Sequence, residues 1–342
     1  IRTTGTSWGF DAVLYPMNCA ADDWFTMIDG AGRILWYEPN DVYFQGIMTG
    51  YDWSQSSRTV LSVNDERFQE QDVGGAVVLE LAEGTDFDAP LHHDTARWGA
   101  LRYLLFEYPV GGLLVDGIHV FDGPTLVGTF LLGDHFFVPG DGAGDWAHGN
   151  GLKVSDDGDI LLSLHVFSSV LSIDGDPASP TFLEIEWLAN GAGGGLPSPD
   201  YVPVGEGFLR QHNASRHGDD LWVFDNDGGA HSQAVRLAID DLAGTITTTG
   251  TWSFDTDCPN QGGAIPLPGG GVLATCANAN LVWAFEEAST EPDWTLTADC
   301  GQQGGAAACR SSARSPCRSS EPVASPPFLL RRFAALAAVG EQ

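Results

Sequence analysis

The segment FTMIDGAGRILWYE, residues Phe25–Glu38, contains an apolar stretch, an Asp-Gly turn and a second stretch rich in aromatic residues. Alternating apolar residues on both sides of a Gly-containing turn are typical of a β-hairpin. The same order of features recurs in five further segments, roughly 40 to 65 residues apart. The five are AVVLELAEGTDF (76–87), GIHVFDGPTLVGTFLL (117–132), VLSIDGDPASPTFLEIEWL (170–188), VRLAIDDLAGTITTTGTWSF (235–254) and LVWAFEEASTEPDWTL (281–296).

Another strand with its own turn precedes several of these copies. The clearest cases are SDDGDILLSLH (155–165), RHGDDLWVFDN (216–226) and PLPGGGVLATCAN (266–278). Six units of about four strands each predict an all-β fold, a six-bladed β-propeller with four-stranded antiparallel blades. A pair of β-sandwiches is the alternative, but it would not require six similar units.

The repeated pattern ends before the last 43 residues. We therefore expect a propeller domain over residues 1–299 and a low-complexity tail over residues 300–342. The tail contains GGAAACRSSARSPCRSSEPVASPP, which lacks strand alternation and is rich in Arg, Ala, Ser, Pro and Gly. Such a composition fits either a disordered tail or a shifted reading frame in a GC-rich gene. In both cases we expect the last blade to lack its outer strands.

Charge and composition exclude several classes of partner. The 342 residues carry a formal net charge of −31, so binding to nucleic acid or to an anionic membrane surface is not expected. No apolar run of about 18 residues is present, so no membrane span is expected. The opening segment, IRTTGTSWGF, reads as folded protein, so we expect a leader either to have been removed or never to have been part of this sequence.

The six cysteines form no Cys-x-x-Cys pair, which argues against a zinc cluster or a thioredoxin-like site. Cys258 and Cys276 flank a Gly-rich turn, where a disulfide across a hairpin is one interpretation and buried free thiols are the other. The disulfide interpretation, together with the acidic composition, favours a periplasmic or secreted protein.

Histidines are concentrated at a few places in the chain. His92 and His93 lie in PLHHDT, His148 in GDWAHGNGL, His165 in ILLSLH and His212 in FLRQHNAS. The first, second and last of these places each precede the strand–turn–strand of their unit, in three successive units. Equivalent positions of a propeller converge near its central axis, so these side chains are expected to meet there. The alternative is that each histidine only braces its own blade.

These residues also carry a family resemblance. The ordered set HHD, DWxHxN, S-x-[R/H]-x-x-S-x-V and QH-[NT]-A followed by FDN resembles the bacterial arylsulfate sulfotransferase family over roughly residues 8–299. The resemblance implies a six-bladed propeller, usually periplasmic, that needs neither cofactor nor the nucleotide donor PAPS. Such an enzyme moves a sulfuryl group from an aryl sulfate donor to a phenol acceptor through a sulfated histidine.

The resemblance assigns roles by motif. The nucleophile falls on His212, the DWxHxN histidine on His148, and the HHD histidine on His92 or His93. The anion-binding arginine of the family falls on His165. The later segment SQAVRL has Gln233 where the family has another arginine. Both departures remove positive charge, and they favour a second hypothesis, a secreted non-catalytic β-propeller that binds a ligand.

The chemistry of sulfuryl transfer needs a neutral nucleophile and a way to neutralise the sulfate oxygens. A neutral imidazole is nucleophilic near neutral pH, and protonated neighbours, for which His148 and His93 are the candidates, can bind oxygens and donate a proton. His165 can replace a guanidinium only while it is protonated. We therefore expect activity to fall as the pH rises through the titration of His165.

Three other polar residues are expected at the site. Asn150 is predicted to face the axis beside His148, and Arg210 and Arg216 flank His212 in sequence and could bind the sulfate ester. The alternative for these arginines, and for Arg236, is pairing with surface aspartates. A zinc ion bound by HHD and His148 is a weaker interpretation, because no tight ligand spacing enforces it, and no metal is assigned.

Overall fold

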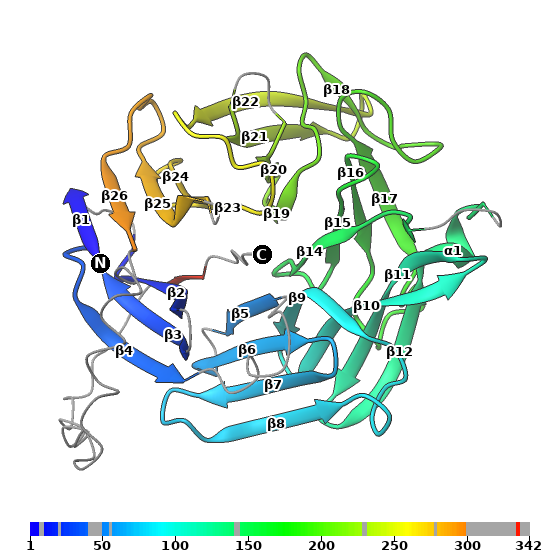
Figure 1. Ribbon diagram of the computed structural model, residues 1–342. Coiled ribbons are helices and arrows are strands. Elements are labelled where there is room, and N and C mark those ends of the chain that lie inside the picture. The colour runs from blue at the N-terminus through cyan, green and yellow to red at the C-terminus, as the bar shows by residue number, and fades with distance from the viewer. Residues whose placement is uncertain are drawn as a thin grey trace, which may run out of the picture.

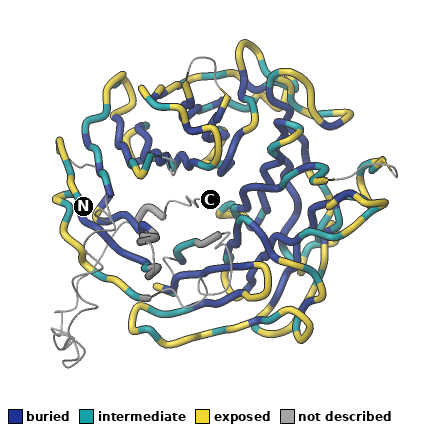
Figure 2. Tube along the Cα trace, viewed as in Figure 1, coloured by how far each residue is buried: buried dark blue, intermediate teal, exposed yellow. Residues whose placement is uncertain are grey.

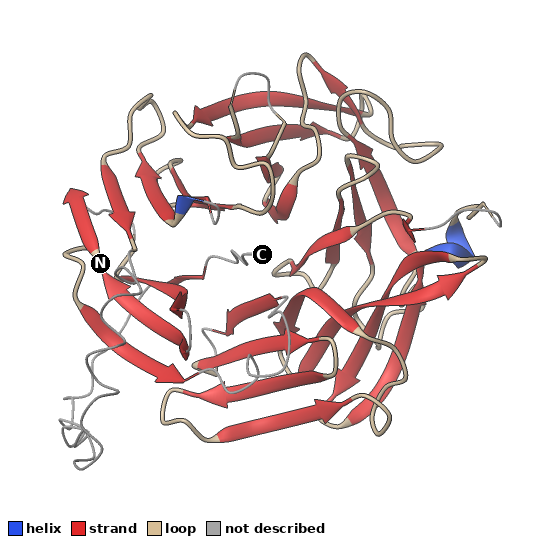
Figure 3. Cartoon of the chain, viewed as in Figure 1, coloured by secondary structure: helices blue, strands red, loops and turns tan. Residues whose placement is uncertain are grey.

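The computed structural model describes residues 1–6, 10–19, 22–39, 50–54, 57–139, 144–227, 231–276, 279–298 and 333–335. Six antiparallel sheets are arranged around a central axis, as Figure 1 shows, so the predicted six-bladed β-propeller is confirmed. Helix is almost absent from the described residues: α1 is a single turn, Leu132–His135 (Figure 3). No helix among the described residues is long and apolar enough to cross a membrane.

Most of the blades are built from consecutive strands. The second blade contains β5 (Gly50–Ser54), β6 (Thr59–Asn64), β7 (Arg67–Asp72) and β8 (Val77–Ala82). The third contains β9 (Leu91–Trp98), β10 (Leu101–Val110), β11 (Leu113–Asp122), β12 (Thr125–Leu131) and the short β13 (Gly144–Asp145). The fourth contains β14 (Gly149–Val154), β15 (Ile160–Leu164), β16 (Ser169–Ile173) and β17 (Ile185–Asn190).

The fifth blade adds one strand at its outer edge. It contains β18 (Val202–Val204), β19 (His212–His217), β20 (Asp220–Asp225), β21 (Gln233–Asp240) and β22 (Thr245–Ser253). Here β18 pairs in parallel with β22, outside the four antiparallel strands. The innermost strands of the third to fifth blades are therefore β9, β14 and β19, which lie next to the centre of the ring in Figure 1.

The ring closes between the two ends of the repeated region. The sixth blade contains β23 (Gly263–Pro266), β24 (Val272–Cys276), β25 (Leu281–Phe285), β26 (Trp294–Thr297) and, from the start of the chain, β1 (Arg2–Gly5). Strand β1 pairs antiparallel with β26, and a Cβ at Gly5 would overlap the carbonyl oxygen of Asp293. The expectation of an incomplete last blade is therefore wrong, because β23–β26 supply four strands and the N-terminal strand β1 adds a fifth at the outer edge.

The first blade takes only three strands from consecutive sequence. These are β2 (Ala12–Cys19), β3 (Asp22–Asp29) and β4 (Ile34–Pro39). Its fourth strand is β27 (Phe333–Ala335), which pairs in parallel with the start of β2 and is drawn in red in Figure 1. Apart from this strand, the predicted tail at 300–342 lies outside the described residues.

Five of the six repeated segments are the third and fourth strands of a blade, joined by a turn. In the segment Phe25–Glu38, the turn is held by Asp29, whose Oδ1 accepts the backbone N–H groups of Ala31 and Arg33. The copy at residues 76–87 was out of register, because it contains only the outer strand β8; the hairpin of that blade is β7–β8.

Apolar clusters between neighbouring blades hold the ring together. Buried residues gather on inner and middle strands, whereas outer strands such as β8 are largely exposed (Figure 2). Between the fifth and sixth blades, the Phe254 ring stacks on Phe224 and Trp283 at centroid distances of 5.5 and 4.7 Å. Stacked aromatic pairs add to the stability that burial of their area provides. This packing keeps the inner strands, and therefore the histidines they carry, at fixed positions.

Candidate active site

The three inner strands that carry the histidines share an irregularity. Each pairs with its neighbour through a register shift: β9 opposite Leu104–Phe106, β14 at Gly149–Gly151 and β19 at His212–Ser215. A β-bulge changes the direction of a side chain and is common near active sites. The sequence places the histidines at these bulges, so the side chains depart from the regular alternation of a strand.

Backbone conformation at the bulges is also unusual. His93, His148 and Asn213, the residue after His212, have φ angles of 52°, 55° and 51°. A non-glycine residue in this left-handed region costs free energy, and such residues cluster at functional sites. Three such residues lie in corresponding places of successive blades. This indicates that the unusual backbone conformation serves to direct the histidine side chains.

The five predicted histidines form one continuous chain of rings. Ring centroids are 5.0 Å apart for His92 and His93, and 4.6 Å for His93 and His148. The chain continues at 5.4 Å from His148 to His165 and at 5.2 Å from His165 to His212. Each contact is edge-to-face. The structure therefore brings together residues from three blades that are up to 120 positions apart in the chain.

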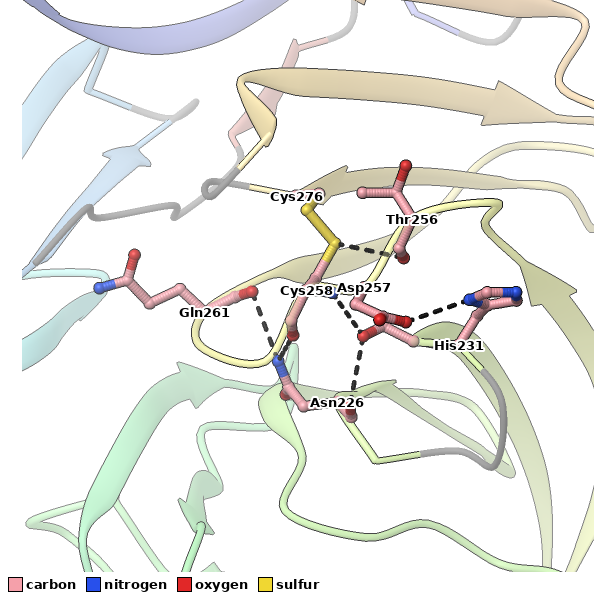
Figure 4. Close-up of a disulfide and its surroundings, with 8 residues drawn as sticks. Asn226, His231, Thr256, Asp257, Cys258, Gln261 and Cys276 are labelled. Carbon is pink, nitrogen blue, oxygen red and sulfur yellow. Dashed lines mark hydrogen bonds and ion pairs between the residues drawn. A yellow bond between two sulfur atoms is a disulfide. The ribbon is translucent and has the colours of Figure 1, made fainter.

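His212 is held in one tautomer by Asn226, at the end of β20. The Nδ1 atom of His212 lies 2.6 Å from Oδ1 of Asn226. The Nδ2 of Asn226 donates to the carbonyl oxygens of Cys258 at 2.7 Å and Gln261 at 3.4 Å, so the amide orientation is fixed (Figure 4). Because Oδ1 can only accept, His212 must donate from Nδ1, which leaves a lone pair on Nε2.

Burial keeps His212 neutral. The side chain is buried, and desolvation lowers its pKa from 6.5 to about 3, although the bond to Asn226 acts in the opposite direction. The charges of His165 and His148 lower this pKa further. His212 is thus a neutral imidazole at any physiological pH, with Nε2 unprotonated.

The loop that orients Asn226 is tied by the predicted disulfide. Cys258 and Cys276 are bonded, which confirms that interpretation over free thiols. The Cys258 backbone N–H donates to Ser232 Oγ, which donates to the Asn226 carbonyl oxygen, so the loop is connected to Asn226 at two points (Figure 4). The pairing of the other cysteines lies outside the described side chains.

His148 is the member of the chain that carries charge. Burial alone would lower its pKa, but the carboxylate of Asp145, which contacts Nδ1, outweighs this effect and raises the pKa above 6.5. Asp145 also accepts the backbone N–H of His148 at 2.9 Å, and its own pKa is lowered by these contacts against the effect of burial. The pair places a protonated imidazole in the middle of the histidine chain.

The other two expected cations are neutral. Burial, followed by the charge of His148, lowers the pKa of His165 to about 4. Burial and the charges of its histidine neighbours lower the pKa of His93 well below 6.5. These low pKa values do not support His93 and His165 as cations for sulfate oxygens near neutral pH, and they do not support a pH dependence from His165 in that range.

Asn150 and Arg210 lie near the chain of histidines, in different roles. The Nδ2 of Asn150 donates to the carbonyl oxygen of Gln211 at 2.8 Å, so Asn150 links β14 to the residue before His212. Arg210 is exposed, and its charge is close enough to His165 to lower the pKa of that side chain. Of the two arginines predicted at the site, Arg210 is therefore the one that lies near the histidines.

Arg216 is directed elsewhere, contrary to its sequence assignment. Its guanidinium lies 5.8 Å from the centroid of the Trp187 ring, and its Nε donates to the Gly218 carbonyl oxygen. The strand β19 carries it away from His212, because Arg216 follows the bulge that spans His212–Ser215. Arg236 follows the alternative interpretation, as it lies 3.9 Å from Asp220.

Sequence reasoning assigned no role to Asp116. This carboxyl, on β11, is fully buried, accepts the Gly149 N–H at 2.7 Å and lies 3.4 Å from His92 Nε2. A Cβ at residue 149 would overlap Asp116 Oδ1, which explains a glycine there. The segment VDG offers no signal of this role, whereas Asp145 and Asn226 lie within the quoted motifs DWxHxN and FDN and could have been found.

Metal-binding geometry is not found in the described part of the chain. No three His, Cys, Asp or Glu side chains there are grouped to hold an ion. The zinc interpretation therefore receives no support from the arrangement of His92, His93 and His148, whose rings meet edge-to-face.

Comparison with protein families and with characterised proteins finds no match. Solved structures resemble the fold. A chain of a nidogen/laminin complex is 11% identical, with 83% of this chain and 92% of that chain covered and a TM-score of 0.50. A Bacteroides caccae protein of unknown function is 12% identical, with 83% and 89% covered and a TM-score of 0.48. A streptogramin B lyase is 12% identical, with 82% of both chains covered and a TM-score of 0.47. These similarities concern the fold alone.

Proposed function

We propose that the protein is an arylsulfotransferase-like enzyme that moves a sulfuryl group between phenolic compounds through a sulfated His212. The observation that carries the proposal is the tautomer of His212: a buried neutral imidazole whose Nδ1–H is held by Asn226, so that Nε2 carries the lone pair. A nucleophilic histidine needs this arrangement, because attack through one nitrogen requires the other to be held.

The proposed reaction has two half-reactions. First, Nε2 of His212 attacks the sulfur of an aryl sulfate, an N–S bond forms, and the S–O bond to the aryl group breaks. The departing aryloxide takes a proton from His148, so the first phenol leaves neutral. In the second half, an acceptor phenol gives its proton to His148, its oxygen attacks sulfur, and the N–S bond breaks. Both His212 and His148 return to their starting states.

The charge distribution suits a monoanionic substrate. Transfer of a sulfuryl group resembles phosphoryl transfer, in which positioning and neutralisation of peripheral oxygens dominate. Protonated His148 supplies a cation inside a strongly acidic protein, and exposed Arg210 adds a second nearby. The disulfide supports a periplasmic or secreted location as part of the proposal.

Incubation with p-nitrophenyl sulfate and phenol tests the proposal. We expect nitrophenol release in the wild type, loss of release in His212→Ala, and a peptide containing His212 heavier by one sulfuryl group. His217→Ala is the matched control, because His217 is an exposed histidine on the same strand. Release that persists in His212→Ala would reject the mechanism.

A non-catalytic binding protein is the second candidate. It is favoured by the side chain at the second family arginine position, Gln233, whose amide donates to Asp225 at 3.1 Å and adds no cation. In this case an aryl sulfate would bind to the wild type without turnover. This candidate would be supported if calorimetry detected binding of the aryl sulfate and mass spectrometry detected no sulfated histidine.

A further inference from the structure

Asp116 and His92 leave two buried polar atoms without partners. In the described part of the chain, neither Oδ2 of Asp116 nor Nε2 of His92 has a hydrogen bond, although Asp116 Oδ1 is 3.4 Å from that nitrogen. Leaving such buried atoms without a hydrogen bond is unfavourable. A small movement would let the Asp116 carboxyl and His92 Nε2 form a hydrogen bond. The carboxyl would be the donor when it is protonated and the acceptor when it is ionised.

The other side of His92 is bonded to the histidine chain. Its Nδ1 lies 2.8 Å from Nδ1 of His93. Only one proton can lie between these two nitrogens, so one imidazole donates and the other accepts. Because each neutral imidazole carries one N–H, the state of His92 Nε2 determines the tautomer of both rings.

We infer that Asp116, His92 and His93 form a proton relay, in which the protonation state of Asp116 decides whether His93 presents an N–H or a lone pair at Nε2. When Asp116 is protonated, it donates to His92 Nε2; His92 then donates from Nδ1 to His93, and His93 carries its proton on Nε2. When Asp116 is ionised, His92 donates to it from Nε2 and accepts at Nδ1, so His93 has a free lone pair on Nε2.

The relay moves one proton without forming a lasting imidazolium. A proton that reaches His93 Nε2 releases the Nδ1 proton to His92, and His92 releases its Nε2 proton to Asp116. No bond between heavier atoms forms or breaks. In sulfuryl transfer, the relay would decide whether His93 presents an N–H or a lone pair beside His148, which takes the proton of the acceptor phenol; this role rests on the proposed function, whereas the tautomer change does not.

The charges around Asp116 suit a proton store. Burial is the largest effect, followed by the charge of Asp145 on β13, and together they raise the pKa of Asp116 to about 8. Glu107 on β10 raises this pKa as well, whereas the Gly149 N–H and the charge of His148 lower it. Tyr108, also on β10, faces the same carboxyl.

The two imidazoles of the relay remain neutral over the same range. Burial lowers the pKa of His92 to about 4, and burial together with neighbouring histidines lowers the pKa of His93 well below 6.5. A neutral ring that exchanges one N–H for the other is what the relay requires. Ionisation of either ring in the working range would remove the link between carboxyl and tautomer.

Nitrogen-15 NMR of the histidine side chains tests the relay directly. Between about pH 6 and about pH 10, we expect His92 and His93 of the wild type to exchange tautomers together, with a midpoint of about 8. In Asp116→Asn the amide oxygen still accepts the Gly149 N–H, but no proton is exchanged, so both tautomers become independent of pH. Glu107→Gln is the matched control, because it removes a nearby charge and retains the switch at a lower midpoint.

Three outcomes would overturn the relay: tautomers that stay constant in the wild type, a change of only one of the two rings, or an unchanged response in Asp116→Asn. The pKa of His148 is also raised by its surroundings, and the comparison with Asp116→Asn separates the effect of its charge. If that variant does not fold, His92→Gln replaces it, with a His93 tautomer that no longer responds to pH. A tautomer switch in a protein without sulfuryl transfer would leave the relay standing and reject the proposed function.

Discussion

Replacing Asn226 with alanine tests whether the tautomer of His212 controls the rate of sulfuryl transfer. The variant removes the acceptor that lies 2.6 Å from His212 Nδ1 and leaves that buried donor unsatisfied. A buried unsatisfied donor costs about 1–3 kcal/mol. This cost destabilises the tautomer with the proton on Nδ1, which is the one that attacks through Nε2. Since each 1.36 kcal/mol changes a rate about tenfold, we expect sulfation of His212 to slow by about 10- to 100-fold.

Single-turnover formation of the sulfated histidine is the assay, because it isolates the step that uses Nε2. The variant also loses the bonds from Asn226 to Cys258 and Gln261, so it will be less stable. Ser232→Ala is the matched control. It removes two bonds in the same loop, to the Asn226 carbonyl and from the Cys258 N–H, but leaves the contact with His212 intact.

Comparison of the two variants shows whether Asn226 acts on the rate of sulfation or only on stability. We expect both to lower the free energy of unfolding by about 1–3 kcal/mol, and only Asn226→Ala to slow sulfation. Equal rates in the two variants would show that Asn226 has a structural role only, and the argument from tautomer to nucleophile would fail.

Three further outcomes are expected. Asp145→Asn removes the partner that raises the pKa of His148. Release of the donor phenol falls as His148 loses its proton with rising pH, so in this variant we expect the fall at a lower pH. A pH–rate profile whose alkaline limb is unchanged would contradict this. Gly149→Ala forces a Cβ against Asp116 Oδ1 and should destabilise the fold by about 1–3 kcal/mol in thermal melts; an unchanged melting temperature would argue against the close approach. Arg216→Gln should leave KM for the aryl sulfate unchanged, because its guanidinium lies over Trp187; a large increase in KM would place it at the site.

The sequence predicts the propeller because its signal is repeated. A single hairpin such as 25–38 indicates only two strands, but five well-placed copies with upstream strands define a ring of blades. The copy at 76–87 shows the limit of this reasoning. Alternation continues across the strand β8 and the turn after it, so the pattern alone does not fix which strand pairs with which.

The meeting of the histidines is predicted from their equivalent positions, but their charges are not. His165 and His148 look alike in sequence, and only the structure shows that one has a carboxylate at Nδ1 and the other is buried without one. The role of Asp116 could not be predicted from the sequence for a related reason. It reaches the site from the third strand of a blade, across the inner strands, and no local pattern records that proximity.

Closure of the ring by β1 has a consequence for biosynthesis. Residues 2–5 are synthesised about 290 residues before their partners, 294–297. At about 5–20 residues per second, the first strand waits about 15–60 s before its partner is made. During that interval, β1 lacks its partner and presents an unpaired edge to other chains, and such edges promote aggregation. The yield of native protein should therefore depend on what shields β1 while the remaining blades are synthesised.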